Sequence, residues 1–173
     1  RSKGVIDPLG NQSYFTFDAL GNPVTSTDER GYSAYFAYDA LSRMTWEKDP
    51  AGDSTYYEQD EVGNVTSVAS GGVATYLSYD GLSRLSGRVN GAGESSYFAY
   101  DPLSNLTRAL NGRGNPSYFA YDPVGRLEAE SDGLLHTTYY AYDPAGNLSE
   151  RIDAEGRQVY FEHDALGRNV HRL

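Results

Sequence analysis

The stretch Tyr-Phe-Ala-Tyr-Asp-Pro-Val-Gly-Arg-Leu at residues 118–127 decides the fold, because versions of it recur along the whole chain. The period is 21 residues, with a single step of 20 between Asp60 and Asp80. Each copy has a repeat-defining tyrosine four residues before a repeat-defining aspartate. The pairs are Tyr14 and Asp18, Tyr35 and Asp39, Tyr56 and Asp60, Tyr76 and Asp80, Tyr97 and Asp101, Tyr118 and Asp122, Tyr139 and Asp143, and Tyr160 and Asp164. Internal repetition of this kind decides the architecture before any other feature does.

Each period contains two turn signals, separated by short stretches of aromatic, Thr, Val and Leu residues. The first turn follows the repeat-defining aspartate, as in Ala-Leu-Gly-Asn at 19–22. The second turn has Asp or Asn three residues before Gly, a pattern broken at Ser70-Gly71-Gly72 and at Asp132-Gly133. Asp and Asn bond the nearby backbone, Gly accepts positive φ, and Pro presets φ for a turn. We therefore predict an all-β fold of about sixteen short antiparallel strands, arranged as tandem β-hairpin repeats.

The length of this array predicts a coiled ribbon. Side chains alternate between the faces of a strand, so the repeat-defining tyrosines share one face and the aromatic residues beside them share the other. Sixteen strands at roughly 4.8 Å make a sheet of ~80 Å, and twisted open sheets rarely exceed ~10 strands without curling. We expect a coiled antiparallel β-ribbon, either a YD-repeat shell or a tubular spiral, in which each hairpin is stabilised by its neighbours. Residues 1–173 are expected to form a single YD-repeat array of about eight 21-residue repeats, truncated within a repeat at both ends.

Composition excludes several classes of function. The net charge of −10 argues against nucleic-acid binding, which needs clustered Lys and Arg. No apolar run approaches the roughly 20 residues of a membrane span. Sixteen tyrosines argue against disorder. Cysteine is absent, which excludes disulfides and thiolate chemistry. The first residue is Arg1 rather than Met, so we expect a processed product or a piece of a longer protein.

No group of residues indicates catalysis, a cofactor or a metal. Thirteen of the fourteen aspartates fall at a turn position, which favours turn hydrogen bonds over acid–base chemistry. Repeated carboxylates suit Ca²⁺, but the nonapeptide pattern of calcium β-rolls is missing. There is no Gly-x-Ser-x-Gly elbow and no evident Ser–His–Asp set. We therefore predict a protein that is not an enzyme, has no cofactor and uses its repeat-defining residues structurally.

Four asparagines are candidate glycosylation sites. Each begins an Asn-x-Ser/Thr sequon, and they are Asn11, Asn64, Asn105 and Asn147. In a host that glycosylates secreted proteins they would be surface attachment points. Three of them follow from the Gly-Asn spelling of the first turn, so drift among the repeats is the simpler explanation.

Three motifs resemble the YD repeat of the Rhs (rearrangement hotspot) proteins. They are the stretch at 118–127, Tyr-Tyr-Ala-Tyr-Asp-Pro-Ala-Gly-Asn-Leu-Ser at 139–149, and Tyr-Phe-Ala-Tyr-Asp-Ala-Leu-Ser-Arg-Met-Thr at 35–45. In that family, which includes bacterial toxin shells, toxin-complex shell subunits and animal teneurins, YD repeats wind as a β-strip around a hollow compartment. The self-cleaving segment of the family and a toxin domain are not recognisable in this sequence. The resemblance therefore implies the wall of a shell rather than its cargo.

Three functions stay open. The first is the β-sheet wall of a hollow, secreted Rhs-type shell that encloses a toxin or other cargo. The second is a self-assembling extracellular filament of the same repeats, since a constant step per repeat generates a regular helix. The third is a carbohydrate-binding adhesive module, in which Trp46 and the tyrosines would stack on sugars. The expected partners are further YD repeats of the same or neighbouring chains, an enclosed toxin polypeptide or surface glycans. The expected location is secreted or on the cell surface of a bacterium.

Overall fold

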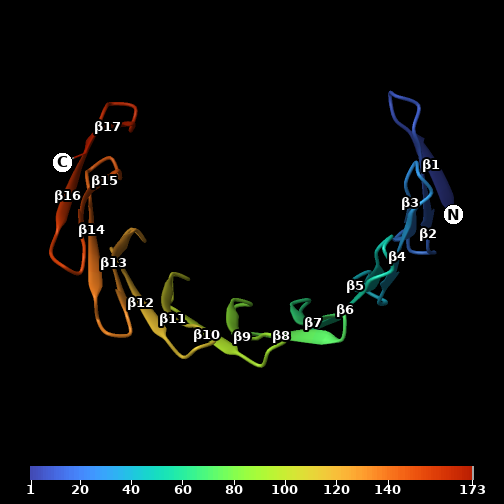
Figure 1. Ribbon diagram of the computed structural model, residues 1–173, viewed down its shortest axis with the longest axis horizontal. Coiled ribbons are helices and arrows are strands. Elements are labelled where there is room, and N and C mark those ends of the chain that lie inside the picture. Colours follow the sequence, from blue (N-terminus) through green and yellow to red (C-terminus); the bar gives the residue numbers. More distant parts are fainter. Residues whose placement is uncertain (173) are drawn as a thin grey trace. The chain divides into compact units, whose positions relative to one another are not determined.

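The computed structural model describes residues 1–172 and confirms the all-β prediction for them. These residues form seventeen antiparallel strands and no helix, so nothing among them meets the length and hydropathy of a membrane-crossing helix. The count exceeds the expected sixteen by one, because residues before the first complete repeat also pair, as β1. The chain divides into two compact units, Arg1–Gly93 and the part from Glu94 onward. Within each unit, every strand pairs with the next one along the chain (Figure 1).

The first unit contains β1 to β9. Their bounds are β1 (Ser2–Ile6), β2 (Gln12–Phe17), β3 (Pro23–Thr27), β4 (Ser33–Tyr38), β5 (Met44–Lys48), β6 (Ser54–Gln59), β7 (Val65–Ser70), β8 (Val73–Tyr79) and β9 (Leu85–Val89). The second unit contains β10 (Ser95–Tyr100), β11 (Leu106–Leu110), β12 (Pro116–Tyr121), β13 (Leu127–Asp132), β14 (Thr137–Tyr142), β15 (Leu148–Ile152), β16 (Gln158–His163) and β17 (Asn169–Arg172).

A β-bulge interrupts every hairpin that is closed by a first turn. In the β12–β13 hairpin, Ala120 lies opposite Ala129 and Tyr121 lies opposite Leu127, so Glu128 is the extra residue. The same shift in register, just before the last residue of the first strand, recurs in the other first-turn hairpins of both units. A bulge bends its strand and increases the local twist. Each repeat therefore bends at the same place.

The backbone ladders between one hairpin and the next are short. The β13–β14 ladder has three pairs and ends, toward the first turns, at Ala129 opposite Tyr139. The equivalent ladders also end at a repeat-defining tyrosine, in β3–β4, β5–β6, β11–β12 and β15–β16. The β7–β8 ladder gains a fourth pair because Gly71 and Gly72, both at positive φ, form a two-residue turn. Beyond these ladders, neighbouring hairpins need side-chain contacts to stay together.

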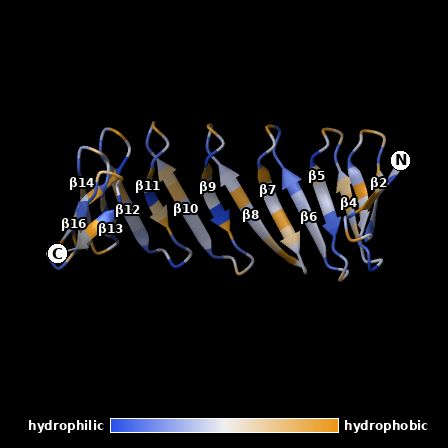
Figure 2. Ribbon diagram, turned by 90° about the horizontal axis from the view of Figure 1, so that it is seen from above, coloured by the Kyte–Doolittle hydropathy of each residue, from blue (hydrophilic) through white to orange (hydrophobic). Residues whose placement is uncertain are grey.

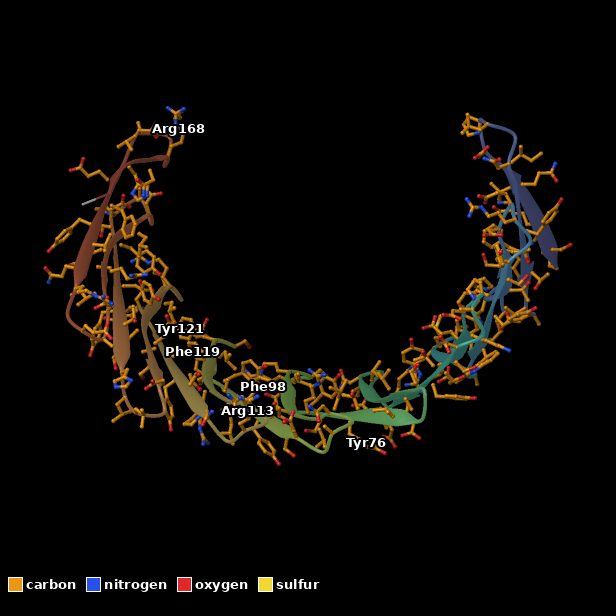
Figure 3. The ribbon with its side chains drawn as sticks, viewed as in Figure 1. Tyr76, Phe98, Arg113, Phe119, Tyr121 and Arg168 are labelled. Atoms are coloured by element: carbon orange, nitrogen blue, oxygen red, sulfur yellow. The ribbon has the colours of Figure 1, made fainter. Side chains whose placement is uncertain are left out.

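Each unit is a single layer of sheet. No hydrophobic side chain among the described residues is buried, and the repeat-defining tyrosines are 38–56% exposed. Aromatic residues on the opposite face are half-buried by their neighbours; in the second unit, Phe98, Phe119 and Tyr121 project from the same face (Figure 3). In the described residues, stability therefore comes from contacts between adjacent strands rather than from a hydrophobic core.

Candidate functional site: the tyrosine–aspartate seam

Each first turn is built around its repeat-defining aspartate. In the Asp122 turn, the N–H of Gly125 donates to the Asp122 carbonyl at 2.9 Å. The Asp122 Oδ1 accepts the backbone N–H groups of Val124 and Arg126 at 3.0 and 2.9 Å. Gly125 has a φ of 82°, a left-handed conformation that glycine adopts without steric cost. The aspartate side chain thus satisfies two backbone donors that the tight turn would leave free.

The residue four positions after the aspartate closes the turn with its own side chain, and we call it the clamp residue. It is Asn or Arg in all eight first turns: Asn22, Arg43, Asn64, Arg84, Asn105, Arg126, Asn147 and Arg168. The Asn64 Nδ2 donates to the Asp60 Oδ2 at 2.8 Å. The Arg126 Nε donates to the Asp122 Oδ2 at 2.6 Å. Sequence reasoning placed this residue in the turn without giving it a role, although its restriction to two residue types was a usable signal.

The second turn at Asp132 departs from the pattern in sequence but not in geometry. The Leu135 N–H donates to the Asp132 carbonyl at 3.0 Å, and Leu135 takes the place of Gly with a φ of 64°. His136 stands at the clamp position, with its Nδ1 3.0 Å from the Asp132 Oδ2. The hydrogen-bond pattern of the turn therefore tolerates a non-glycine residue in the left-handed conformation.

The same hydrogen bonds hold the turn carboxylates in their ionised form. The Asn64 side-chain amide, followed by backbone N–H groups, lowers the pKa of the Asp60 carboxyl below its ordinary value. The Arg43 backbone N–H, followed by its guanidinium, lowers the pKa of Asp39. A carboxyl that acts as a general acid near neutral pH needs a raised pKa instead. Over residues 1–172, no three His, Asp or Glu side chains gather into a possible metal site.

The residue just before the aspartate joins its hairpin to the preceding one. The Tyr79 hydroxyl donates to the Val65 carbonyl at 2.9 Å. Gln59, which departs from the aromatic pattern, donates its Nε2 to the Met44 carbonyl at 2.7 Å. Val65 and Met44 occupy equivalent positions, beyond the last backbone pair between the two hairpins. The glutamine amide therefore does the work of the tyrosine hydroxyl.

Clamp residues also reach the first turn of the next repeat. The Asn22 Nδ2 donates to the Ser42 Oγ at 3.0 Å, and the Asn64 Nδ2 donates to the Ser83 Oγ at 3.2 Å. Ser42 and Ser83 hold the left-handed position that Gly takes elsewhere, with φ of 60° and 59°. These contacts tie one turn to the next and offset part of the cost of a serine at positive φ.

A cation–π contact extends this line of contacts in the second unit. The Arg126 guanidinium carbon lies 4.6 Å from the ring centroid of Tyr142, within the ~6 Å range of such interactions. We call the repeat-defining aspartates, the clamp residues and the residues just before the aspartates the tyrosine–aspartate seam.

The predicted site residues fall into two places. The repeat-defining aspartates lie in the first turns, and the repeat-defining tyrosines lie within the strands, on the exposed face. Trp46 is half-buried opposite Tyr56 in the β5–β6 ladder.

The sequon asparagines are part of the turn clamps. Each donates its Nδ2 to an aspartate Oδ2 at 2.8–2.9 Å, as seen for Asn11, Asn64, Asn105 and Asn147. Because N-glycosylation modifies this nitrogen, a glycan would displace the clamp. Use of these sequons stays a prediction.

Comparison with known proteins places the chain among the repeat proteins that its motifs resemble. The solved structures to which it is similar include TcdB2-TccC3, at 14% identity and a TM-score of 0.43, and a TccC3 variant of the Photorhabdus luminescens Tc holotoxin pore, at 13% identity and a TM-score of 0.42. The alignments cover 94% of this chain but only 13% of each of those chains. No curated protein matches the sequence. The RHS Repeat family model matches residues 17–54 and 121–158. Over these two segments the chain is therefore an RHS-repeat protein, which confirms the resemblance indicated by its tyrosine–aspartate motifs.

Proposed function

We propose that the chain is a non-catalytic wall segment of a hollow Rhs-type shell that encloses a toxin or other cargo. The observation that carries this proposal is the seam, which joins successive hairpins by the same kinds of contact in the two segments matched by the RHS Repeat model and in the repeats between them. An array extended by equal steps suits a wall, because each added hairpin meets the same neighbours.

The chemistry of the described residues supports a structural role. The aspartates are the most regular ionisable groups of the chain, and their oxygens accept turn hydrogen bonds that lower the pKa of most of them. Groups engaged in this way stabilise turns rather than exchange protons with a substrate. We therefore propose that the chain is not an enzyme.

The proposal also specifies the setting of the wall. Its partners would be further YD repeats of the same or neighbouring chains and an enclosed toxin polypeptide. The shell would be a secreted or surface product of a bacterium. The coiling of the ribbon, which such a compartment requires, stays a prediction.

Electron microscopy of the native material tests the shell directly. Particles from the producing organism would be imaged by negative stain and then by cryo-electron microscopy. Closed, hollow particles of uniform size, with density inside, would support the shell and its cargo. Long filaments with a regular axial repeat would contradict the proposal and show that the array is itself a polymer.

A further inference from the structure

Every first turn carries an exposed apolar tip. The residue two positions after the repeat-defining aspartate is Leu or Val in seven repeats and Ala145 in the eighth. The large side chains are 67–78% exposed: Leu20, Leu41, Val62, Leu82, Leu103, Val124 and Leu166. Nothing in either unit covers these side chains.

The turn itself does not require an apolar residue at this position. In the second turns, where Arg30 and Arg113 stand at the equivalent place, the backbone N–H donates to the Asp28 or Asn111 Oδ1 at 3.0 Å. The Leu41 N–H donates to the Asp39 Oδ1 in the same way, at 2.9 Å. The same geometry therefore accepts a charged side chain at the second turns, whereas the first turns never contain one at this position.

The apolar tips form a row in each unit. Alternate turns of consecutive antiparallel strands lie on the same edge of a sheet, and their tips are orange at the β8–β9 and β10–β11 turns (Figure 2). Neighbouring tips are two strands apart, about 9.6 Å. We call the row the apolar ridge: Leu20, Leu41, Val62 and Leu82 in the first unit, and Leu103, Val124, Ala145 and Leu166 in the second. Of the three residues at each turn tip, only Glu61 is charged.

We propose that the apolar ridge packs against the apolar ridge of a second copy of this chain. The chain has a net charge of −10, so two copies repel each other except where charge is sparse. The ridge is such a place, whereas the second-turn tips bear charged residues that include Glu29, Arg30 and Glu155.

The spacing of the ridge makes it complementary to itself. A second row shifted by half a period places each tip about 4.8 Å from two tips of the first row, close to the ~4.0–4.5 Å of apolar contact. A two-fold axis produces this arrangement with the same patch on both copies. A surface without this period could meet only some of the tips.

The buried area indicates a reversible dimer. At about 25 cal/mol per Å², the 1.5–3 kcal/mol of a buried Leu or Val corresponds to roughly 60–120 Å² of apolar surface. Seven such side chains then bury about 400–800 Å² per copy, against about 800 Å² per partner in a standard stable interface. We therefore expect association that depends on protein concentration.

Sedimentation velocity over a range of concentrations tests the interface with two matched pairs of substitutions. The ridge pair is Leu41→Ser with Leu103→Ser, one in each unit. The control pair is Leu9→Ser with Leu134→Ser, whose side chains are 87% and 78% exposed in second turns of the same geometry. The ridge pair should weaken dimerisation by at least about tenfold, and the control pair should leave it within about twofold. Both pairs should melt like the parent chain, because these side chains are exposed.

Disulfide trapping provides an independent measurement, since the chain has no cysteine. Under mild oxidation, Leu103→Cys should form covalent dimers much faster than Leu134→Cys. A parent chain that stays monomeric at high concentration would overturn the proposal. Equal weakening by the ridge and control pairs, or equal trapping at the two cysteines, would overturn it as well.

Discussion

The Tyr142 hydroxyl donates a 2.9 Å hydrogen bond to the backbone carbonyl of Leu127, across the boundary between two repeats. The backbone ladder between β13 and β14 has already ended, at Ala129 opposite Tyr139. The two tyrosines of the motif therefore have different places. The repeat-defining tyrosine stands at the end of the ladder, and the tyrosine before the aspartate continues the connection by its side chain.

Removal of this one hydroxyl should weaken the connection between hairpins. Tyr142→Phe keeps the ring but leaves the Leu127 carbonyl without its donor, so the free energy of unfolding should fall by about 1 kcal/mol. Tyr139→Phe is the matched control in the same strand, where the side chain is 52% exposed. It should change the free energy of unfolding by less than ~0.5 kcal/mol. Urea denaturation of both variants measures the difference, and equal losses would show that the hydroxyl of Tyr142 does not connect the repeats.

A glycine at position 135 should stabilise the chain. Leu135 has a φ of 64° and is 72% exposed, so its side chain contributes little packing to offset its strained backbone. The left-handed conformation costs a non-glycine residue about 1–2 kcal/mol, and the extra freedom of glycine in the unfolded chain returns about 0.5–1 kcal/mol of that. Leu135→Gly should therefore gain roughly 0.5–1 kcal/mol in urea denaturation. Leu134→Gly, next to it and without positive φ, should lose stability; a loss in both variants would mean that the Leu135 side chain has a stabilising contact.

The hairpin array was predictable because its signals are local. Asp122, Gly125 and Arg126 act on one another within five residues, so spacing and residue type are enough to predict a turn there. The turn role of the aspartates follows from the same short-range chemistry. Repetition of these signals every 21 residues then predicts the strand order.

The seam could not be predicted because its partners lie far apart in sequence. Gln59 binds a carbonyl fifteen residues away, at Met44, and that contact depends on where the intervening ladder stops. The bulge at Glu128 has no distinctive residue to mark it, because its place is set by the register of the whole hairpin. The apolar residues at the turn tips are visible in the sequence, but their exposure is a property of the folded sheet.

Acid should loosen the turns over a defined range of pH. The hydrogen bonds of Asn64 and of the turn backbone lower the folded-state pKa of Asp60 from 3.8; similar bonds lower that of Asp143. A carboxyl whose folded-state pKa is lowered contributes stability above its unfolded pKa and loses it as pH falls through the folded value. The melting temperature should therefore be steady from neutral pH to about pH 5 and fall below that. Asp60→Asn and Asp143→Asn together should make the decline shallower, and a decline that begins near neutral pH would assign it to other groups.

Two glutamates should separate Tyr57 and Tyr140 in an alkaline titration. The hydrogen bond from the Tyr57 hydroxyl to the Glu47 Oε1, at 2.5 Å, is the main cause that raises the pKa of Tyr57 to about 12. Burial is the main cause for Tyr140, ahead of its 2.6 Å hydrogen bond to Glu130, and its pKa also rises to about 12. Glu47→Ala should therefore lower the pKa of Tyr57 further toward 10.0 than Glu130→Ala lowers that of Tyr140.

The ultraviolet absorbance of tyrosinate measures both shifts, with Tyr57→Phe and Tyr140→Phe used to assign each step. The contribution of either tyrosine to stability is complete below pH 10, because the unfolded form is then protonated too. It is lost as the pH rises from there through about 12, since the unfolded chain ionises first. Equal shifts in the two glutamate variants would contradict the different causes assigned here, because burial of Tyr140 persists when Glu130 is removed.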